Sequence, residues 1–462
     1  MYGPETIKRL IGQIAHEVGV ALPSVRVTAA EPVLPSAFRI DLAAAASVGA
    51  MTAAVAAYAG AGEAGVDSRH AEIAFQSERH FLIGGTGIDP WAPLSGDYRT
   101  SDGWVRLHCN FAHHRDAALR ALGLSPAAEA PQREDVAEAC SRRTACEIEE
   151  AVTREGGCAA AMRSRQEWLT HPQAAAVAGS PLVGLRRIDA GRAGGRTGEI
   201  RGSGPRPLSG VRVLDLTRVI AGPVAGRALA AYGADVLRVG AAGLPEVPGL
   251  VVETAFGKRS CHVDLRAESE VLRELVRHAD VVIQAYRPGT LRDRGFGPED
   301  LARLRPGIVC VDISAYGSRG PWAARRGFDS LVQMATGLAH ENGDGSRPHP
   351  LPAQVLDHAS GYLAAFAATA GLLRRRAEGG SWHAEVSLAG TAQWLCALGP
   401  GDREQRAQAP MDDLQATMDS SFGTLTYVRP PGWIQGAEPY WASPPPRQGE
   451  HPAEWVTTTT RG

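Results

Sequence analysis

The spacing of apolar residues divides the chain near residue 210. Before that point the pattern is mostly helical, with amphipathic spacing over 5–18 and 134–153 and one short strand-like segment at 104–108. After it, short runs of Val, Ile and Leu alternate with helical segments. Strands are expected at 211–216, 235–239, 281–284 and 308–314, and helices at 223–232 and 268–278. Because strands that alternate with helices form parallel sheets, we predict an α/β fold with a Rossmann-like parallel sheet domain and a smaller α+β domain.

A stretch without apolar periodicity separates the two predicted domains. Residues 189–210 read DAGRAGGRTGEIRGSGPRPLSG, and a run of Gly, Arg and Pro of this kind is typical of a linker. We therefore expect four units along the chain. They are an N-terminal helical segment with the small α+β domain at 1–188, a Gly/Arg/Pro linker at 189–207, the sheet domain at 208–400, and an extended Pro-rich tail at 401–462.

One segment is apolar enough to require a choice between a membrane span and a buried helix. The run at 42–62 consists mainly of Ala and Gly, whose transfer out of water gains little free energy, and Asp41 precedes it at the position of a helix N-cap. We predict a helix buried in the protein, and no membrane partner.

The amino-acid composition of the chain limits the classes of function that we expect for it. Of the 462 residues, 44% are hydrophobic and 21% are charged, a balance that is typical of a folded globular protein and argues against disorder. The 48 basic and 50 acidic residues give a net charge of −2, so we expect no nucleic-acid partner. The seven cysteines form no C-x-x-C pair, so we expect no bound metal. Residues 1–20 do not show the charged, apolar and small-residue pattern of a secretory leader, so we expect a cytoplasmic location.

Candidate ligand-binding residues follow the predicted strands. The strand at 211–216 runs into TRVIAGPVAG and then a helix, so that the AGP turn (Ala221, Gly222 and Pro223) permits a ligand to approach the backbone at the end of the strand. Basic residues lie in the loops GKRS, YRPG and DRGFG, and guanidinium groups in such loops are suited to phosphate recognition. These residues are Lys258, Arg259, Arg287 and Arg294.

These segments, in this order, resemble the family III CoA-transferases, which include formyl-CoA and carnitine CoA-transferases and the α-methylacyl-CoA racemases. The resemblance extends over 208–396 and includes LSGVRVLDLTRVIAGPVAGRALAAYGADVLRV, GKRSCHVDL, ADVVIQAYRPGTLRDRGF and QVLDHASG. It implies coenzyme A as co-substrate, with no metal or redox cofactor, and it places the catalytic aspartate at Asp357. It also implies that the AGP turn, the GKRS loop, Arg287 and Arg294 contact CoA. Phe328 is expected to pack against CoA or to exclude water.

The implied reaction transfers CoA from an acyl-CoA thioester to a free carboxylic acid. Asp357 is expected to form first a mixed anhydride and then an aspartyl-CoA thioester. Two alternatives remain open. One is a 2-methylacyl-CoA racemase, for which the family uses a histidine where this chain has Phe328. The other is a catalytically inactive CoA-binding subunit.

The resemblance also concerns assembly and domain order. Similar proteins form interlocked homodimers, so a homodimer is implied. The segments 96–108 and 159–173 resemble the small domain that follows the sheet domain in the family, yet here they precede it. We therefore expect a permuted domain order.

Overall fold

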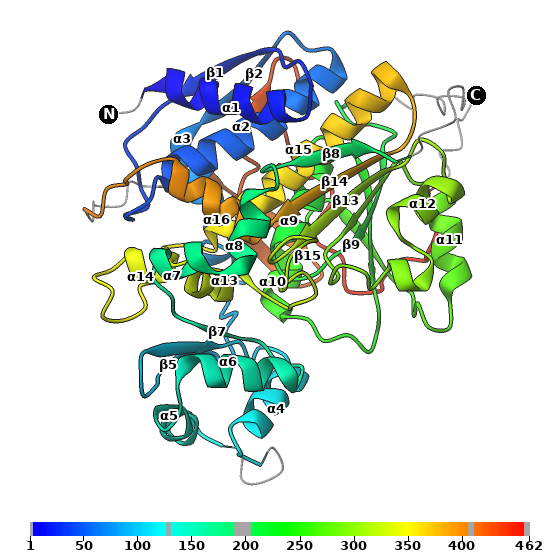
Figure 1. Cartoon of the computed structure of the whole chain (residues 1–462). Helices are drawn as coiled ribbons and strands as arrows, with labels where there is room; N and C mark the ends of the chain where they lie inside the picture. The colour runs from blue at the N-terminus through cyan, green and yellow to red at the C-terminus, as the bar shows by residue number, and fades with distance from the viewer. Residues whose placement is uncertain (1–2, 126–130, 189–204, 405–410, 457–462) are drawn as a thin grey trace.

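A seven-stranded sheet forms the centre of the computed structural model, which describes residues 3–125, 131–188, 205–404 and 411–456 (Figure 1). The strands stand in the order β11-β10-β9-β12-β13-β14-β8. Neighbours from β11 to β14 pair in parallel, whereas β8 joins the edge antiparallel to β14. Their bounds are β8 (Gly184–Arg187), β9 (Arg212–Leu216), β10 (Asp235–Gly240), β11 (Lys258–His262), β12 (Val281–Gln284), β13 (Val309–Ser314) and β14 (Trp382–Ser387).

This strand order is that of doubly wound α/β proteins. Numbered along the chain from β9, the parallel strands stand 3-2-1-4-5-6, so the order reverses between β9 and β12. In β9, residues 213–216 are all buried, as expected for a strand that is covered on both faces. The predicted α/β class with a parallel sheet is confirmed, and the four expected strands appear as β9, β10, β12 and β13.

Helices cover both faces of the sheet. On one face lie α2 (Ile40–Ala59), α9 (Ala221–Ala231) and α15 (Val355–Glu378), and α15 contacts both of the others. On the other face, α11 (Ser269–Arg277) and α12 (Pro298–Leu304) close a second core. Helix α2 is long and apolar enough to cross a membrane, yet 89% of its most apolar window is buried inside the fold. The prediction of a buried helix is confirmed.

The N-terminal residues pack on this helical layer. Helix α1 (Pro4–Glu17) contacts α2 and shares the core that covers the sheet. Strands β1 (Ser24–Thr28) and β2 (Glu63–Asp67) form a three-stranded sheet with β17 (Trp433–Ile434). After β2 follow α3 (Ser68–Ala74) and a short 3-10 helix, η1 (Ser77–Arg79).

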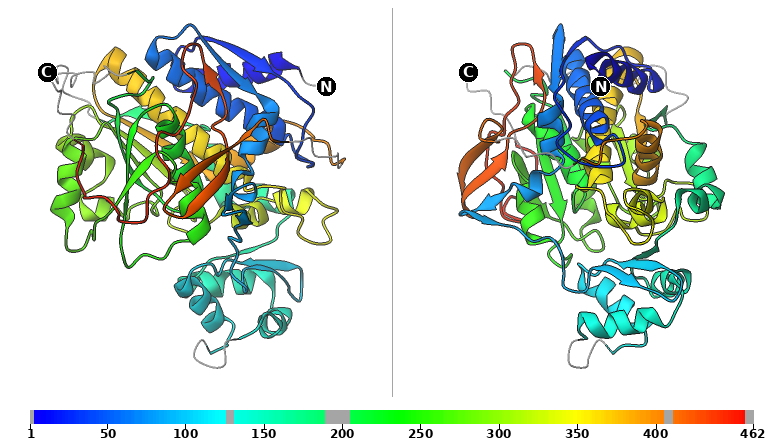
Figure 2. Two further views of the ribbon diagram at one scale, coloured as in Figure 1. Left: turned by 180° about the vertical axis from the view of Figure 1, so that it is seen from behind. Right: turned by 90° about the vertical axis from the view of Figure 1, so that its left-hand side faces the viewer.

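A small unit projects from this body (Figures 1 and 2). Its core is its own, and the buried residues of that core lie between Leu94 and Ala161. The predicted unit at 1–188 is corrected accordingly, because α1 and α2 belong to the main core and β8 belongs to the main sheet. The elements of the small unit are β5 (Gly96–Arg99), β6 (Trp104–Leu107), α4 (Ala112–Ala121), α5 (Arg133–Ser141), α6 (Ala145–Arg154) and β7 (Ala159–Ala161).

Short helices connect the small unit and the end of the sheet. Among their contacts, α13 packs on β7, α14 on α7, and α16 on α8. A further short helix, α10 (Pro248–Glu253), lies beside η1. The bounds of the connecting helices are α7 (Arg165–Thr170), α8 (Pro172–Ala178), α13 (Asp329–Ala335), α14 (Leu338–Glu341) and α16 (Leu388–Ala397).

The C-terminal residues are more structured than the predicted extended tail. Strands β15 (Gln415–Ser420) and β16 (Gly423–Val428) form a hairpin that continues into β3 (Leu82–Ile83) and β4 (Thr86–Gly87). Further on, the ring of Trp441 stacks on that of Phe256 with 5.0 Å between centroids. The prediction of an extended tail is corrected because these aromatic and strand contacts hold the segment on the body. Of the predicted linker, residues 189–204 lie outside the described residues.

Candidate active site

A groove of about 480 Å³ opens at the carboxyl ends of β9, β12 and β13. Residues 216–222, 285–288 and 313–315 line it. It therefore lies where the strand order reverses between β9 and β12, which is the position at which open α/β sheets bind their ligands.

The turn after β9 is tightly built. Val219 has a φ of 73°, which a β-branched residue rarely adopts and which costs on the order of 1–3 kcal/mol. A Cβ at Gly222 would overlap the side chain of Thr217, so that position accepts only glycine. Helix α9 begins at Ala221. Because the first N–H groups of a helix have no partner within it, the turn presents backbone donors to an anion in the groove.

Arginines dominate the charge of the groove. The five that line it are Arg218, Arg266, Arg287, Arg325 and Arg326. Of the residues predicted to bind CoA or react with it, Ala221, Gly222, Arg287, Phe328 and Asp357 also line the groove. The structure therefore brings together the AGP turn, one predicted arginine and the predicted nucleophile around one concave surface that suits a polyphosphate.

Lys258 is placed elsewhere. It is fully buried, and its Nζ donates to Asp215 Oδ2 at 2.7 Å and to Pro223 O at 2.8 Å. Asp215 also accepts from the backbone N–H of Thr217 at 3.0 Å. The predicted contact of Lys258 with CoA is thus corrected: the ammonium group supports the AGP turn from below, and Pro223 directs its carbonyl to Lys258 and not to the groove.

Arg259 and Arg294 also lie outside the set of residues that line the groove. Arg259 pairs with Asp235 at 3.1 Å and donates to Glu454 O at 2.8 Å, so it holds the C-terminal segment against the sheet. The predicted contact of Arg259 with CoA is therefore corrected. Arg294 is exposed in the 3-10 helix η2 (Arg292–Arg294), and its contact with CoA stays a prediction.

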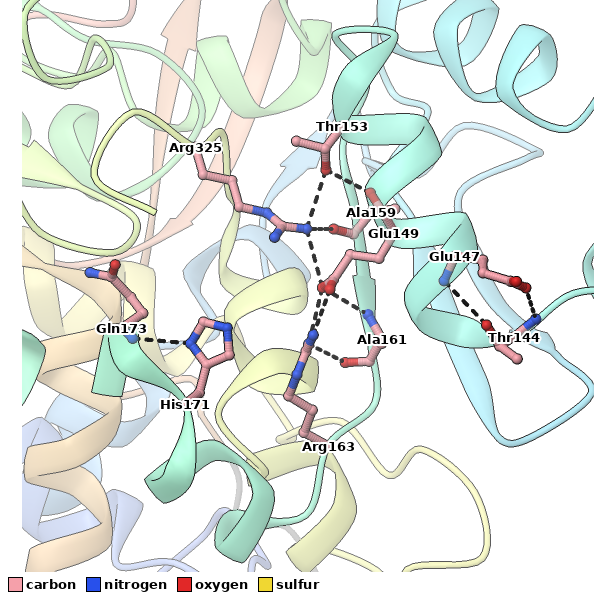
Figure 3. Close-up of polar contacts among 10 residues, drawn as sticks. All are labelled: Thr144, Glu147, Glu149, Thr153, Ala159, Ala161, Arg163, His171, Gln173 and Arg325. Atoms are coloured by element: carbon pink, nitrogen blue, oxygen red, sulfur yellow. Dashed lines mark hydrogen bonds and ion pairs between the residues drawn. The ribbon is translucent and has the colours of Figure 1, made fainter. Parts of the chain in front are cut away.

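The small unit holds Arg325, which precedes Phe328 by three residues, through polar contacts (Figure 3). Glu149 of α6 is buried and pairs with Arg163 at 3.0 Å and with Arg325 at 3.2 Å. Arg325 donates further to Thr153 Oγ1 at 3.2 Å. Since Arg325 also lines the groove, this ion network couples the position of the small unit to the shape of the groove.

Asp357 lies in the first turn of α15 and is only 6% exposed. Its backbone N–H donates to Asp329 Oδ2 at 2.9 Å. Helix α15 approaches α9 closely at this end, because a Cβ at Gly361 would stand 2.6 Å from Ala221 O. The packing of two helices through a glycine therefore brings the carboxyl of Asp357 to the AGP turn.

The carboxyl groups around Asp357 perturb one another. Burial raises the pKa of Asp357 well above its ordinary value, and the nearby charges of Asp329 and Glu78 raise it further. Burial likewise raises the pKa of Asp329 to about 6, against hydrogen bonds that lower it. Because two close carboxylates resist double ionisation, the pair retains a proton more readily than either group alone.

A second cavity, of about 110 Å³, adjoins the groove. Both spaces are lined by Val219, Ile220, Phe328 and Asp357, so the nucleophile candidate lies at their junction. A single water needs only about 10–15 Å³. The cavity is thus large enough for a short organic chain, and we term it the acyl cavity.

Two histidines lie close to Asp357 or to the acyl cavity. The ring of His108 stacks on Phe328 with 3.7 Å between centroids, and burial lowers the pKa of His108 to about 3, with smaller effects from His114 and Arg106. His358 follows Asp357 on α15, and its Nε2 lies 3.0 Å from Glu78 Oε2. Burial has the largest effect on the pKa of Glu78 and raises it, but His358, a backbone hydrogen bond and the charge of Arg79 together leave that pKa lowered.

Comparison with known proteins identifies the domain that contains this site. The sequence model of CoA-transferase family III matches residues 208–434. These residues belong to CoA-transferase family III. The chain is 38% identical over 203 residues to a probable fatty acyl-CoA transferase of Mycobacterium tuberculosis, which is 40% of this chain and 50% of that protein. It is 35% identical to the succinyl-CoA:glutarate CoA-transferase of Mus musculus over 45% of this chain and 52% of that protein.

Among solved structures, a crystal structure of a variant of the Mycobacterium tuberculosis protein covers 53% of this chain and 97% of its own, with 25% identity and a TM-score of 0.47. The chain spans about half the length of the curated relatives it matches. Within the described residues, no group of three or more His, Cys, Asp or Glu side chains is placed to hold a metal ion.

The family III domain supplies the groove and Asp357, but part of the acyl cavity comes from outside it. Glu78, Trp91 and His108 line or adjoin the cavity and precede residue 208. Sequence reasoning missed these three, because no local motif marks them. Asp329 could have been identified from the sequence, because it follows Phe328 in the segment GFDS, which belongs to the region that resembles the family.

Proposed function

We propose that this protein is a CoA-transferase that moves CoA from an acyl-CoA thioester to a free carboxylic acid, with Asp357 as nucleophile. The supporting observation is the place of Asp357 at the junction of the arginine-lined groove and the acyl cavity. A thioester with its CoA in the groove and its acyl group in the cavity has its carbonyl carbon between the two, beside this carboxyl.

The proposed reaction has four steps, and each step has one nucleophile and one leaving group. The Asp357 carboxylate attacks the thioester carbonyl and expels CoA thiolate, which leaves a mixed anhydride. The thiolate attacks the aspartyl carbonyl, forms an aspartyl-CoA thioester and releases the first acid as its carboxylate. The acceptor carboxylate then attacks that thioester and expels CoA thiolate. Finally the thiolate attacks the acceptor carbonyl of the new anhydride, which yields the product thioester and restores Asp357.

The raised pKa of Asp357 favours the protonated form of this carboxyl, which does not act as a nucleophile. Only the ionised form of Asp357 attacks, and burial together with Asp329 raises its pKa. A carboxylate that does form there is poorly solvated and hence more reactive than one in water. The N–H groups at the start of α9 are suitable donors for the tetrahedral oxyanion.

Trapping tests the nucleophile. Incubation with acyl-CoA, followed by hydroxylamine or borohydride, is expected to modify the peptide that contains Asp357, as read by mass spectrometry. The variant D357A is expected to lose the adduct and the turnover, whereas D344A, which removes an exposed carboxylate that lines neither the groove nor the acyl cavity, is expected to keep both. Turnover of D357A at the wild-type rate would contradict the assignment.

Racemisation of a 2-methylacyl-CoA is a second candidate, favoured by the histidine that shares the acyl cavity with Asp357. Removal and return of an α-proton needs an acid and a base with pKa values near the working pH. The pKa of His108 is lowered to about 3, chiefly by burial, and Phe328 carries no proton to exchange. We therefore expect transfer of CoA without uptake of deuterium at the α-carbon in deuterated water. Rapid uptake without transfer would reverse this ranking, and bound CoA without either reaction would favour an inactive subunit.

We further propose an interlocked homodimer in the cytoplasm and a permuted domain order. The small unit, with its core between Leu94 and Ala161, precedes the family III domain at 208–434, which supports the permuted order. All seven cysteines are free thiols, which supports a reducing compartment. Sedimentation is expected to show a dimer at micromolar concentration, and an active monomer would contradict the homodimer.

A further inference from the structure

The unit of the fold that contains Asp357 has a counterpart near the N-terminus. β13, α15, β14 and α16 form a strand–helix–strand–helix unit at 309–397, which we call the late unit. β1, α2, β2 and α3 form another at 24–74, which we call the early unit. In both units the two strands pair in parallel. The long helices of the two units lie side by side, since α15 contacts α2 and Arg376 Nη1 donates to Tyr58 O at 2.8 Å (Figures 1 and 2).

The ends of the elements match between the two units. Each long helix is capped by a glycine with positive φ, Gly60 at 73° and Gly379 at 67°, and the next strand begins three residues later. That strand ends in each unit at a residue that caps the following helix. The side chains of Asp67 and Ser387 each accept from the backbone N–H three residues later, at 2.9 and 3.1 Å. A βαβ connection alone is common in parallel sheets, but the same caps at the same spacing indicate a repeat.

The two units also exchange an edge strand. β8, which follows the early unit in the chain, pairs antiparallel with β14 of the late unit, and β17, which follows the late unit, pairs antiparallel with β2. When the ends of β2 and β14 are aligned, Ala64 corresponds to Ala384. Ala64 pairs with Ile434 of β17, and Ala384 pairs with Leu185 of β8. Each unit therefore receives, in the same register, a strand that follows the other unit, which is the arrangement of a domain swap within one chain.

Asp41 is the counterpart of Asp357 in the early unit, because both lie in the first turn of the long helix. The Asp41 carboxylate already has a partner in the protein. Arg39 Nε donates to Asp41 Oδ1 at 2.8 Å, and Arg39 Nη2 donates to Asp41 Oδ2. The side chains of Arg39 and Asp41 are only 11% and 12% exposed. A carboxylate held by two bonds from one guanidinium is stabilised as an anion and is therefore a weak nucleophile.

The connection before the long helix differs between the two units. Residues 29–39 connect β1 to α2, whereas 315–354 connect β13 to α15. The longer connection includes α13, and it supplies Phe328, Asp329 and Ser330 to the acyl cavity. The connection of the early unit, which the structure describes in full, is too short for such a segment. The difference in length also hides the repeat from an inspection of sequence spacing.

We propose that this chain contains two interlocked copies of one βαβα unit, and that only the late copy is reactive. The early copy takes the place that a second subunit has in a swapped dimer: it covers α15, and the segment after it supplies Trp91 and His108 to the acyl cavity. The small unit precedes the family III domain because it follows the early copy. The statement on reactivity rests on the proposed CoA-transferase function. The exchange of strands does not, and it is distinct from the association of two chains.

Disulfide trapping tests the exchange of strands. The pairs L185C/A384C and A64C/I434C place two thiols opposite one another on exchanged strands, at Cα separations that a disulfide spans. The full chain is oxidised at micromolar concentration, unfolded, and separated on a non-reducing gel. We expect both pairs to form a disulfide within one chain. The controls are L185C/I434C, whose positions belong to different sheets, and the parent protein, whose seven cysteines are free thiols.

Two results of this trapping would overturn the inference. Covalent dimers from either pair, when both controls give none, would place the exchange between chains. Thiols that stay reduced in both pairs would show that the exchanged strands do not meet.

Mass spectrometry of the trapped acyl-enzyme tests which copy reacts. We expect one adduct per chain, on the peptide that contains Asp357, and one bound CoA per chain in calorimetry. D41N alone leaves the Arg39 charge without its partner, so R39Q/D41N, which removes both charges, is the variant of choice. This double variant is expected to keep kcat within about threefold of the wild type.

The outcomes separate the failure of the inference from that of the proposed function. An adduct on the peptide that contains Asp41, or two bound CoA molecules per chain, would show two reactive copies and overturn the inference while CoA transfer stands. No adduct and no transfer of CoA would overturn the proposed function and the statement on reactivity, and the disulfides would still decide the exchange of strands.

Discussion

Replacement of Lys258 by methionine distinguishes a structural role from a role in binding CoA. The ammonium group and the carboxylate of Asp215 are 1% and 0% exposed and lie 2.7 Å apart. Burial lowers the pKa of Lys258, and Asp215 opposes this effect by raising it. The pair also reaches the ligand turn, through Pro223 O and the backbone N–H of Thr217.

The expected loss of stability follows from the charge that remains. K258M leaves the carboxylate of Asp215 buried without its counter-ion, and removal of one partner of a buried pair costs about 3–5 kcal/mol. Typical domains are stable by about 5–15 kcal/mol, so this is a large part of the total. The double variant D215N/K258M removes both charges and keeps an oxygen that accepts from Thr217. We expect it to recover more than half of the loss.

Urea unfolding, followed by tryptophan fluorescence, measures the stability of the three proteins, and calorimetry measures their affinity for CoA. Because Lys258 Nζ does not line the groove, the double variant is expected to bind CoA within about threefold of the wild type. If K258M were as stable as the wild type and bound CoA at least tenfold more weakly, the structural role argued here would be refuted and a direct contact with CoA restored.

Two further predictions concern the groove and the nucleophile. R287A is expected to weaken CoA binding about tenfold, since Arg287 lines the groove, and R294A is expected to weaken it as well if the predicted contact of Arg294 with CoA forms; an affinity of R287A equal to that of the wild type in calorimetry would contradict the geometry. The value of kcat/KM is expected to rise with pH as Asp357 ionises. D329N removes a negative neighbour and so favours the ionised form of Asp357, which is expected to move this rise to lower pH. An unchanged profile would show that another group titrates.

The sheet could be predicted from sequence because its signals are local. The four predicted strands, β9, β10, β12 and β13, are short apolar runs, and the turn after β9 carries its glycine within the segment that identifies it. The place of Asp357 at the groove could be anticipated for the same reason, since QVLDHASG lies in the segment that resembles the family, and its role as nucleophile stays a prediction. Strand β11 reads KRSCH, and its polar side chains gave no strand signal. The boundaries of the small unit could not be predicted from the sequence, because the sequence does not show that α1 and α2 belong to the main core.

The errors at the site arise from contacts between distant residues. Lys258 occurs in a loop-like sequence that is typical of a phosphate contact, but its partner Asp215 lies 43 residues earlier and withdraws it from the groove. Glu78 and His358 are 280 residues apart in sequence, and no local sequence motif indicates that they form a pair. Propensity and spacing describe neighbours along the chain, so an ion pair of this kind becomes visible only with the fold.

The arrangement around Asp357 explains why the site needs so much support from residues that do not touch the groove. Two carboxyl groups with raised pKa values and a valine with positive φ are each costly on their own. They persist because the surroundings leave no alternative: Gly361 fixes α15 against α9, and the buried pair of Lys258 and Asp215 fixes the turn. A bound thioester can then offset part of that cost, since the arginines that line the groove are placed to bind its phosphates.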